Sequence, residues 1–485
     1  MKTDVLIIGG GVIGCAVAYE LARYELDVTV VEKNSDIANG TSKANSGICH
    51  NGMGEKPGTI CSSYVTRGYA LMKDLCEQLY VPYSHCVGSV TAAFNDEELK
   101  KLERAKMAGE MLGIHDTRIV HGDELFDLEP GLNRALKYAL YNPGLSTVSS
   151  YELTIALGES AAINGVHFLL DCAVTSIECS GGKVECVRTT RGDIQPQVVI
   201  NAAGLYADRI AAMVEEIDFE IRPRKGEYFL YDKKCRGAIR HIVSDLGSEH
   251  SKAMIIAPTV HGNILAGSSA TMIERKDDLA THGDKLDMIY DTFISRMIPA
   301  LPRAGQVITT FAGNRAAATS EDFIIQHART VKGFINLAGM QSPALTSAPA
   351  IAQDTAEMVA ECGLKLTPRK DYKPFRPKPV RLSELTPDEL NALIRRNPDY
   401  GEIICRCETI SKGEILDAIR SPIPAITVDA VKRRARAGMG RCQGGFCGPR
   451  VMDIIARELG KDMTAVNKSN QGSYMVVSRT KEAQK

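Results

Sequence analysis

Residues 3–33, TDVLIIGGGVIGCAVAYELARYELDVTVVEK, decide the fold of the N-terminal part of this chain. The stretch predicts an apolar strand, a glycine turn, an amphipathic helix and a second strand, which together form a βαβ unit. Gly9, Gly11 and Gly14 fit the spacing GxGxxG, which allows a tight turn, a close approach of a pyrophosphate and close packing of helix on strand. Glu32 ends the second strand, where a carboxylate accepts hydrogen bonds from a ribose. The pattern predicts a dinucleotide site for a cofactor without a 2'-phosphate, and it does not separate FAD from NAD.

Four cysteines near the C-terminus form a second motif. Cys405 and Cys407 stand in IICRCETI, and Cys442 and Cys447 stand in GMGRCQGGFCGPR. Two short cysteine loops brought together by a small helical unit supply the four thiolates that a [2Fe-2S] cluster requires. A structural zinc site is the main alternative, but zinc loops favour about two to four residues between paired ligands. Because the first gap here is one residue, we interpret the cysteines as cluster ligands, with inert cysteines as the third possibility.

Composition and charge place few limits on the partners. The chain has 485 residues, 44% of them hydrophobic and 24% charged, which suits two or three globular domains. Its net charge of -1 gives no electrostatic case for a nucleic acid or for an anionic membrane. The cysteines outside the cluster motif are scattered and do not form a disulfide framework, so we expect a reducing compartment.

Targeting and membrane signals are weak in this sequence. The chain opens directly on a strand pattern without the charged region, apolar core and cleavage site of a signal peptide. No run reaches the roughly 18 apolar residues of a spanning helix. We therefore expect a cytoplasmic protein with no transmembrane segment, and the sequence leaves a peripheral membrane association open.

Two parts of the chain resemble known families. Residues 40–53, GTSKANSGICHNGM, resemble the flavin-covering loop of the D-amino-acid oxidase superfamily, and within it the segment shared by L-2-hydroxyglutarate oxidases and mycoplasma-type glycerol-3-phosphate oxidases. The stretches FAGNR, SEDFII and MQSPALTSAPAI are similar to the same enzymes. The cysteine pattern CxC followed by GMGxCQGxxC resembles the BFD-like [2Fe-2S] domain. Both parts occur together in the A subunit of anaerobic glycerol-3-phosphate dehydrogenases.

The resemblance implies a fold that is α/β and α+β. We expect a Rossmann-like FAD-binding domain with an antiparallel-sheet substrate domain over residues 1–362, followed by a small helical BFD-like [2Fe-2S] domain. The FAD-binding segments are expected at about 1–80, 145–220 and 330–362, and the substrate domain at about 81–144 and 221–329. We expect a Pro/Lys/Arg-rich linker at 363–400, the cluster domain at 401–460 with helices at 413–421 and 451–459, and a C-terminal tail at 461–485.

The resemblance also implies which residues contact FAD. Besides Gly9, Gly11, Gly14 and Glu32, these are Thr41, Ser42, Asn45, Ser46, Gly47, Val174, Gly204, Gly339, Met340, Gln341 and Ser342. The last four precede a helix whose positive N-terminus is expected to point at the flavin ring and to stabilise its anionic reduced form.

A base is needed to oxidise a secondary alcohol at a flavin, because hydride transfer to the flavin N5 requires removal of the hydroxyl proton. Neutral imidazole suits this near pH 7, and the resemblance places His50 over the flavin. The alternative is a loop histidine satisfied by a backbone carbonyl. Ser46 is expected to orient the substrate or to form a hydrogen bond with the flavin.

An anionic substrate needs a cation at its far end. Arg315 in FAGNRAA matches a substrate-binding arginine of the resembling families, and a guanidinium binds phosphate or carboxylate in a bidentate manner. A surface salt bridge is the alternative, and Lys225 in RPRKGEY is a second candidate. Ala316 follows Arg315 where the families often have proline, so the shape of the anion pocket is not carried over.

The basic run VKRRARAGMGR, at 431–441, allows two interpretations. It either keeps the surface soluble, or it docks an acidic electron partner and eases reduction of the cluster.

The resemblance implies an FAD-dependent dehydrogenase that oxidises sn-glycerol 3-phosphate to dihydroxyacetone phosphate, with electrons leaving through a [2Fe-2S] cluster. The first alternative is an L-2-hydroxyglutarate or other 2-hydroxyacid dehydrogenase or oxidase, and the second is an electron-transfer subunit of a multisubunit flavoenzyme. An electron-acceptor protein or partner flavoprotein subunits are the expected partners.

Overall fold

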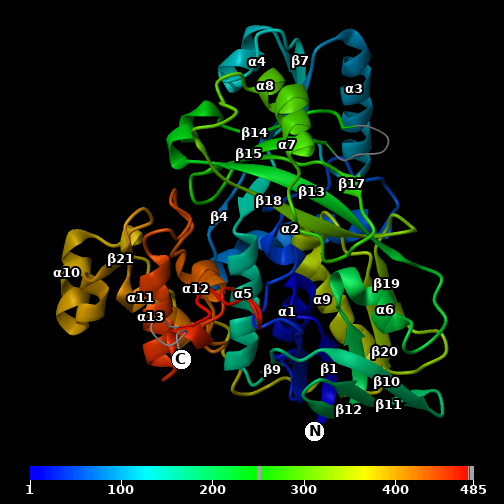
Figure 1. The fold of residues 1–485 in the computed structure, drawn as a ribbon. Helices are drawn as coiled ribbons and strands as arrows, with labels where there is room; N and C mark the ends of the chain where they lie inside the picture. Colours follow the sequence, from blue (N-terminus) through cyan, green and yellow to red (C-terminus); the bar gives the residue numbers. More distant parts are fainter. Residues whose placement is uncertain (248–252, 479, 481–485) are drawn as a thin grey trace.

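The computed structural model describes residues 1–247, 253–478 and 480. Three bodies are visible in Figure 1: a layered domain at the N-terminus, a second sheet above it, and a small helical domain at the side. Residues 248–252 of the expected substrate domain, and residues 479 and 481–485 of the expected tail, lie outside the described residues. The overall arrangement confirms the expected fold class.

The N-terminal domain is built on a largely parallel sheet. Its strands are β1 (Lys2–Ile8), β2 (Val28–Val31), β9 (His167–Leu169), β10 (Val174–Ser180), β11 (Lys183–Thr189), β12 (Gly192–Asn201), β19 (Ile324–His327) and β20 (Phe334–Ala338). The order runs β10-β11-β12-β1-β2-β9, with β20 also beside β12. β1 is parallel to β2 and β12, while β10, β11 and β12 form an antiparallel meander. β2 and residues 198–201 of β12, which flank β1, are fully buried, because helices cover this part of the sheet.

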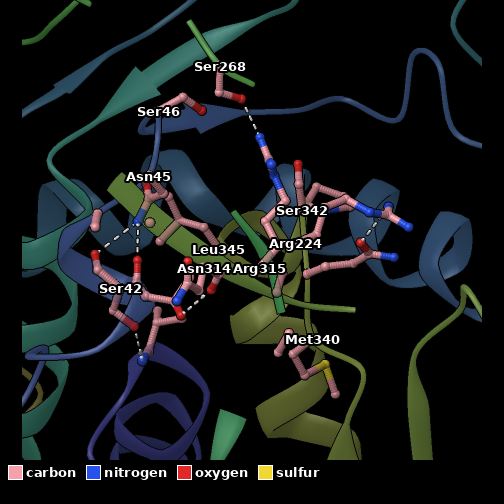
Figure 2. Close-up of a pocket in the computed structure, with 18 of the residues that line it drawn as sticks. Ser42, Asn45, Ser46, Arg224, Ser268, Asn314, Arg315, Met340, Ser342 and Leu345 are labelled. Carbon is pink, nitrogen blue, oxygen red and sulfur yellow. Dashed lines mark hydrogen bonds between the residues drawn. The ribbon is translucent and has the colours of Figure 1, made fainter. Parts of the chain in front are cut away.

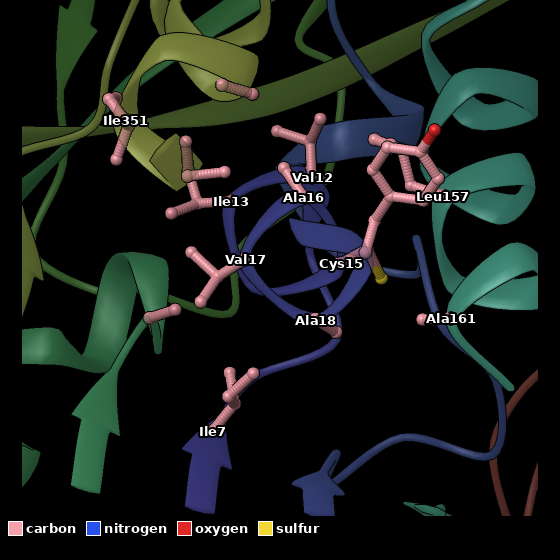
Figure 3. Packing of buried hydrophobic residues seen from close by; sticks show 14 of the residues in the cluster. Ile7, Val12, Ile13, Cys15, Ala16, Val17, Ala18, Leu157, Ala161 and Ile351 are labelled. Atoms are coloured by element: carbon pink, nitrogen blue, oxygen red, sulfur yellow. The ribbon is translucent and has the colours of Figure 1, made fainter. Parts of the chain in front are cut away.

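Helix α1 (Val12–Leu21) is buried at every residue. It lies between α5 (Ser150–Ile163) and α9 (Ala344–Glu361), and α2 (Ile60–Gln78) packs on the other side of α9. Figure 3 shows Leu157 and Ala161 of α5 on one side of α1 and Ile351 of α9 on the other. A Cβ on Gly14 would lie 2.0 Å from the Gly9 carbonyl oxygen, so only glycine lets α1 pack this closely.

The second sheet forms the substrate domain. Its strands are β5 (Ser89–Ala93), β6 (Arg118–His121), β7 (Tyr138–Asn142), β13 (Ile221–Tyr231), β14 (Ile242–Ser244), β15 (Ile255–Pro258), β16 (Ile264–Gly267), β17 (Thr271–Met272) and β18 (Val307–Ala318). All pairs are antiparallel except β5 with β14. Its helices are α3 (Asp96–Met111), α4 (Asp123–Leu128), α7 (Gly283–Ile289) and α8 (Ser295–Met297). The sheet thus joins segments that precede and follow residues 145–220 in the chain.

The cluster domain, together with the helix that precedes it, contains four α-helices and a two-stranded sheet within the described residues. They are α10 (Pro387–Arg396), β21 (Ile403–Cys405), β22 (Ile410–Ser411), α11 (Lys412–Ile419), α12 (Val428–Ala435) and α13 (Gly448–Glu458). The predicted helices correspond to α11 and α13. Ile415, Val431 and Ile455 belong to its own hydrophobic core, which is separate from the core of the sheets.

The linker expected at 363–400 is largely structured. Its second half contains α10, which begins with a capping box between Thr386 and Glu389 and a proline in the first turn. Its first half is extended but fixed: the Arg376 side chain is buried, donates to the Leu79 carbonyl at 2.9 Å and pairs with Glu159 at 2.8 Å. The segment therefore attaches to the FAD domain and is not a free spacer.

The tail expected from residue 461 is also ordered at its start. Val466 is buried in the core of the cluster domain, and Asn467 forms an isolated antiparallel bridge with Tyr474. Among the described residues no helix is long and apolar enough to cross a membrane.

Candidate active site

A cavity of about 1390 Å³ lies between the two sheets. Its wall at one end is formed by the glycine turn after β1 and by the end of β2. At the other end it is formed by β5, β13, β14 and β18 of the substrate domain. The loop at 39–50 runs along its length, so dinucleotide-binding and substrate-domain residues share one continuous space.

The glycine turn and Glu32 form the dinucleotide end. Gly9 has a φ of 114°, and a Cβ there would lie 2.5 Å from the Ala202 carbonyl oxygen, so the close approach requires glycine. The Glu32 carboxylate is buried and accepts from the Gly10 N–H at 2.7 Å and the Asn34 N–H at 2.9 Å. Burial raises the pKa of Glu32. The acceptor that we expected for a ribose is therefore in the cavity wall and is fixed by backbone donors.

The loop at 41–47 completes the N-terminus of α1. Ser42 Oγ accepts from the Val12 N–H at 2.9 Å, which satisfies one donor of the first turn. Asn45 Nδ2 donates to the carbonyls of Ser42 and Thr41 at 2.9 and 3.1 Å, and Figure 2 shows these contacts inside the cavity. Thr41 Oγ1 donates to the Asn314 carbonyl of β18 at 2.7 Å. The loop thus connects the dinucleotide end to the substrate sheet.

Most of the residues predicted to contact FAD line the cavity. They are Gly9, Gly11, Glu32, Thr41, Ser42, Asn45, Ser46, Gly204, Met340, Gln341 and Ser342.

Gly14, Gly47, Gly339 and Val174 are not among the residues that line it. The glycines act through the backbone: Gly47 and Gly339 have positive φ and pack against the carbonyls of Val148 and Asp322. Val174, at the start of β10, packs beside a hydrophobic cluster of the first sheet. The predicted contact of these four residues with FAD therefore stays a prediction.

His50 and Ser46 both line the cavity. His50 follows the short strand β3 (Ile48–Cys49), which pairs with β8 (Ser146–Val148). Its backbone N–H donates to Thr346 Oγ1 of α9 at 3.1 Å. The His50 imidazole therefore lies on a segment that is held by hydrogen bonds to β8 on one side and to α9 on the other.

Arg315 lies on β18 and lines the cavity. Its guanidinium donates to Ser268 Oγ, as Figure 2 shows, and to the Ser269 carbonyl at 3.3 Å. No carboxylate of the described residues lies within ion-pair distance of it. Neutral groups hold the side chain in place, and no described carboxylate neutralises its positive charge.

The structure does not support Lys225 as a second anion ligand. Its ammonium is buried, pairs with Asp278 at 2.7 Å and donates to the Ala280 carbonyl at 3.1 Å. Its neighbour Arg224 lines the cavity instead and lies directly opposite Arg315 in the β13–β18 ladder. Arg224 pairs with Glu321 at 2.6 Å, so its charge is partly neutralised. Successive residues of a strand point to opposite faces, so only one of these two neighbours can face the cavity, and the sequence does not show which.

Further polar residues of the substrate domain were not foreseen. Thr91 and Ser244 line the cavity and share a hydrogen bond at 2.9 Å. Asp245 lies beside them, and burial raises its pKa. They come from different strands and belong to no motif, so their convergence is visible only in the fold.

The four predicted cluster ligands come together at the base of α13. Cys407 Sγ lies 3.8 Å from Cys405 Sγ and 3.9 Å from Cys442 Sγ. The Cys447 thiol donates to Cys405 and lowers the pKa of Cys405 to about 5. Contacts link the four sulfurs in the order Cys447, Cys405, Cys407 and Cys442. Four thiols gathered in this way are the ligand set that a [2Fe-2S] cluster requires.

Two arginines of the basic run before Cys442 have buried side chains at the contact with the FAD domain. Arg433 and Arg434 of α12 are almost fully buried and pair with Asp36 of the FAD domain at 2.6 and 3.0 Å. Arg434 also pairs with Glu159 of α5 at 3.1 Å. Burial opposes ionisation of Asp36, but the two guanidiniums outweigh it and lower the pKa of Asp36. The run fixes the cluster domain to the FAD domain, and Figure 1 shows α12 beside α5.

Comparison with known proteins agrees with both parts of the chain. Residues 4–358 match the family described as FAD dependent oxidoreductase, and residues 403–457 match the BFD-like [2Fe-2S] binding domain. A glycerol 3-phosphate dehydrogenase of Caloramator mitchellensis is 41% identical over 478 residues, 99% of each chain. A glycerol 3-phosphate oxidase of Mycoplasma pneumoniae is 32% identical over 76% of this chain and 97% of its own.

A solved structure has the same fold. The dithionite-reduced L-alpha-glycerophosphate oxidase from Mycoplasma pneumoniae with FAD bound is 31% identical, with a TM-score of 0.73 over 78% of this chain and 98% of its own. The cavity residues fit the same cofactor, because glycine backbone, a helix N-terminus and a ribose acceptor line one end of a single space. The chain therefore belongs to the FAD dependent oxidoreductase family, is an FAD-binding oxidoreductase, and carries a C-terminal BFD-like [2Fe-2S] binding domain.

Proposed function

We propose that this chain oxidises sn-glycerol 3-phosphate to dihydroxyacetone phosphate and passes the electrons through its [2Fe-2S] cluster. Bound FAD supplies the two-electron acceptor at flavin N5, and the cluster supplies a one-electron carrier. The relatives support the substrate, since the glycerol 3-phosphate dehydrogenase is similar over 99% of each chain.

The observation that supports the proposal most directly is the environment of the Arg315 guanidinium. A guanidinium in the cavity wall, held by Ser268 and Ser269 and without a carboxylate partner among the described residues, is suited to a phosphate. The substrate hydroxyl then lies toward His50. His50 accepts the hydroxyl proton as the carbon that bears this hydroxyl loses a hydride. Ser46 on the same loop orients that hydroxyl. Proton and hydride together account for the two hydrogens that the alcohol loses.

In this proposal, a separate protein or a partner subunit accepts the electrons from the cluster. Relatives named as anaerobic glycerol-3-phosphate dehydrogenase subunits support this, at 25% identity over 94% of this chain in both Escherichia coli and Haloferax volcanii. Cysteines without disulfides in the described structure fit a reducing compartment such as the cytoplasm.

A substrate panel under argon tests the proposal. The flavin absorbance of the purified holoenzyme should bleach with sn-glycerol 3-phosphate and stay unchanged with its enantiomer and with glycerol. L-2-hydroxyglutarate belongs in the panel, because L-2-hydroxyglutarate dehydrogenases are relatives at 24–26% identity. Bleaching by the 2-hydroxyacid in place of the phosphate ester would establish the alternative. A flavin that no substrate reduces would favour a role as an electron-transfer subunit.

A further inference from the structure

The loop at 34–43 lies between the FAD cavity and the cluster domain. On one side, Asn34, Asn39 and Lys43 line the cavity next to Glu32. On the other side, the loop forms hydrogen bonds with α12 and with the turn at 467–474 that follows α13. No part of this turn belongs to the matched family segments, which end at residues 358 and 457.

Asn39 joins the two sides. Its side chain is 9% exposed, so its amide must be satisfied within the protein. Its oxygen accepts from Lys43 Nζ at 2.5 Å and from Arg433 at 3.3 Å. Its nitrogen donates to Ser469 Oγ at 3.2 Å and to Asn470 Oδ1 at 2.8 Å. Three of these four partners belong to the cluster domain or to the turn after it.

Asn470 reaches the cavity itself. Together with Ser469 it lines the cavity at the end that contains Glu32. Its oxygen accepts from Asn39 and from the Ser35 N–H at 3.3 Å, and its nitrogen donates to Asn34 Oδ1 at 2.9 Å. The side chain is thus held on three sides by the loop that follows the ribose acceptor.

The turn is a fixed part of the cluster domain. The Val428 and Asp429 N–H groups at the start of α12 donate to the carbonyls of Asn467 and Lys468 at 3.2 and 2.8 Å. Lys468 Nζ pairs with Asp429 at 2.9 Å. The turn therefore moves with α12, whose Arg433 and Arg434 bind Asp36 on the same loop.

We propose that the turn at 467–474 is part of the FAD site: Ser469 and Asn470 close the ribose end of the cavity, so that FAD binding and docking of the cluster domain favour each other. Two elements of the cluster domain hold the loop that forms this wall, and the wall holds the cofactor. Binding energies linked in this way are reciprocal: loss of the Asn470 contacts weakens FAD binding, and bound FAD stabilises the turn.

The first test is the FAD affinity of the deflavinated full-length protein, measured by titration of flavin fluorescence. Asn470→Ala removes three hydrogen bonds to the loop, so we expect FAD to bind about 3- to 30-fold more weakly. Gln471→Ala, an exposed neighbour in the same turn, is the control and should stay within about twofold of wild type. Equal affinities of the two variants would overturn the proposal.

The second test uses wild-type protein only and so does not depend on the folding of a variant. Amide hydrogen exchange is compared in the deflavinated and FAD-loaded forms, both with the cluster in place. The Lys468 and Ser469 N–H groups, which donate to Ser473, should exchange more slowly when FAD is bound. Unchanged exchange there, with protection gained around Gly9–Gly14, would show that FAD does not sense the turn and would overturn the proposal.

Discussion

His50 lies on the cavity wall with its backbone bonded to α9, so replacing its side chain should leave the loop in place. His50→Gln keeps a polar side chain of similar size but removes the proposed base. We expect FAD to remain bound and the limiting rate of flavin reduction by sn-glycerol 3-phosphate to fall about 100- to 10,000-fold. Anaerobic stopped-flow measures that rate, and a wild-type limiting rate would show that the proton leaves through another group.

Arg315 should act on binding more than on rate. Arg315→Lys keeps the charge but loses the planar fork that contacts a phosphate at two points, so the half-saturation concentration should rise about 10- to 100-fold. Arg222→Lys, an exposed position on the neighbouring strand β13, is the matched control. The same stopped-flow series gives both constants. An unchanged half-saturation concentration would remove Arg315 from the anion site.

The error over Lys225 shows where residue types stop being informative. Both Arg224 and Lys225 are cations in one strand, and only the direction of each side chain decides which one reaches the cavity. That direction depends on the register of β13 against β18, which is a long-range pairing. Arg315 was predicted because a motif fixed its position, whereas nothing local fixed the face of β13.

The contact between α12 and the FAD domain depends on the buried carboxylate of Asp36. Asp36→Asn would leave the Arg433 guanidinium buried without its ion-pair partner, which typically costs about 3–5 kcal/mol. We expect the cluster domain to unfold at clearly lower urea concentration, followed by loss of the cluster absorbance. Glu402→Gln, which breaks the exposed pair with Arg450, should change stability by less than about 1 kcal/mol. Equal effects of the two variants would contradict the assigned role of Asp36.

The buried carboxyl of Glu152, on α5, should make the stability of the folded protein depend on pH. Burial opposes its ionisation, but His261, Arg381 and Arg436 outweigh burial and lower the pKa of Glu152 to about 2. A carboxyl whose pKa is lowered by folding stabilises the folded state above its ordinary value of 4.5, and this contribution is lost as pH falls toward about 2. The melting temperature of Glu152→Gln should lie below wild type at pH 7, and the difference should shrink between about pH 4.5 and pH 2. A difference that stays constant across this range would refute the assignment.

Elements were predictable wherever their pattern is local. The βαβ unit, α11 and α13 follow from periodicity and glycine spacing. Helix α10 was missed although Thr386 and Glu389 form a capping box, because proline and basic residues around it suggested a linker. The sequence of α12 indicates only a charged run, because burial of Arg433 and Arg434 depends on carboxylates about 275 to 398 residues away in sequence.

At the scale of the whole molecule, the cluster domain has its own core and contacts the FAD domain through ion pairs and hydrogen bonds. Cys442→Ser should therefore remove the iron and its visible absorption while FAD stays bound near one equivalent. Cys179→Ser, at an exposed cysteine of β10, is the control and should change neither. Iron and FAD analyses of anaerobically purified protein check this. Stoichiometric zinc in place of iron and sulfide in the wild type would contradict the electron-transfer role.

The most direct test of the account is anaerobic mixing of the holoenzyme with sn-glycerol 3-phosphate, followed by flavin absorbance and by electron paramagnetic resonance of frozen samples. The account predicts that the flavin is reduced first and that the signal of a reduced [2Fe-2S] cluster then appears, with dihydroxyacetone phosphate as the product. In Cys442→Ser the flavin should still be reduced, without any cluster signal. A flavin that stays oxidised with sn-glycerol 3-phosphate, or a wild-type cluster that stays oxidised once the flavin is reduced, would contradict it.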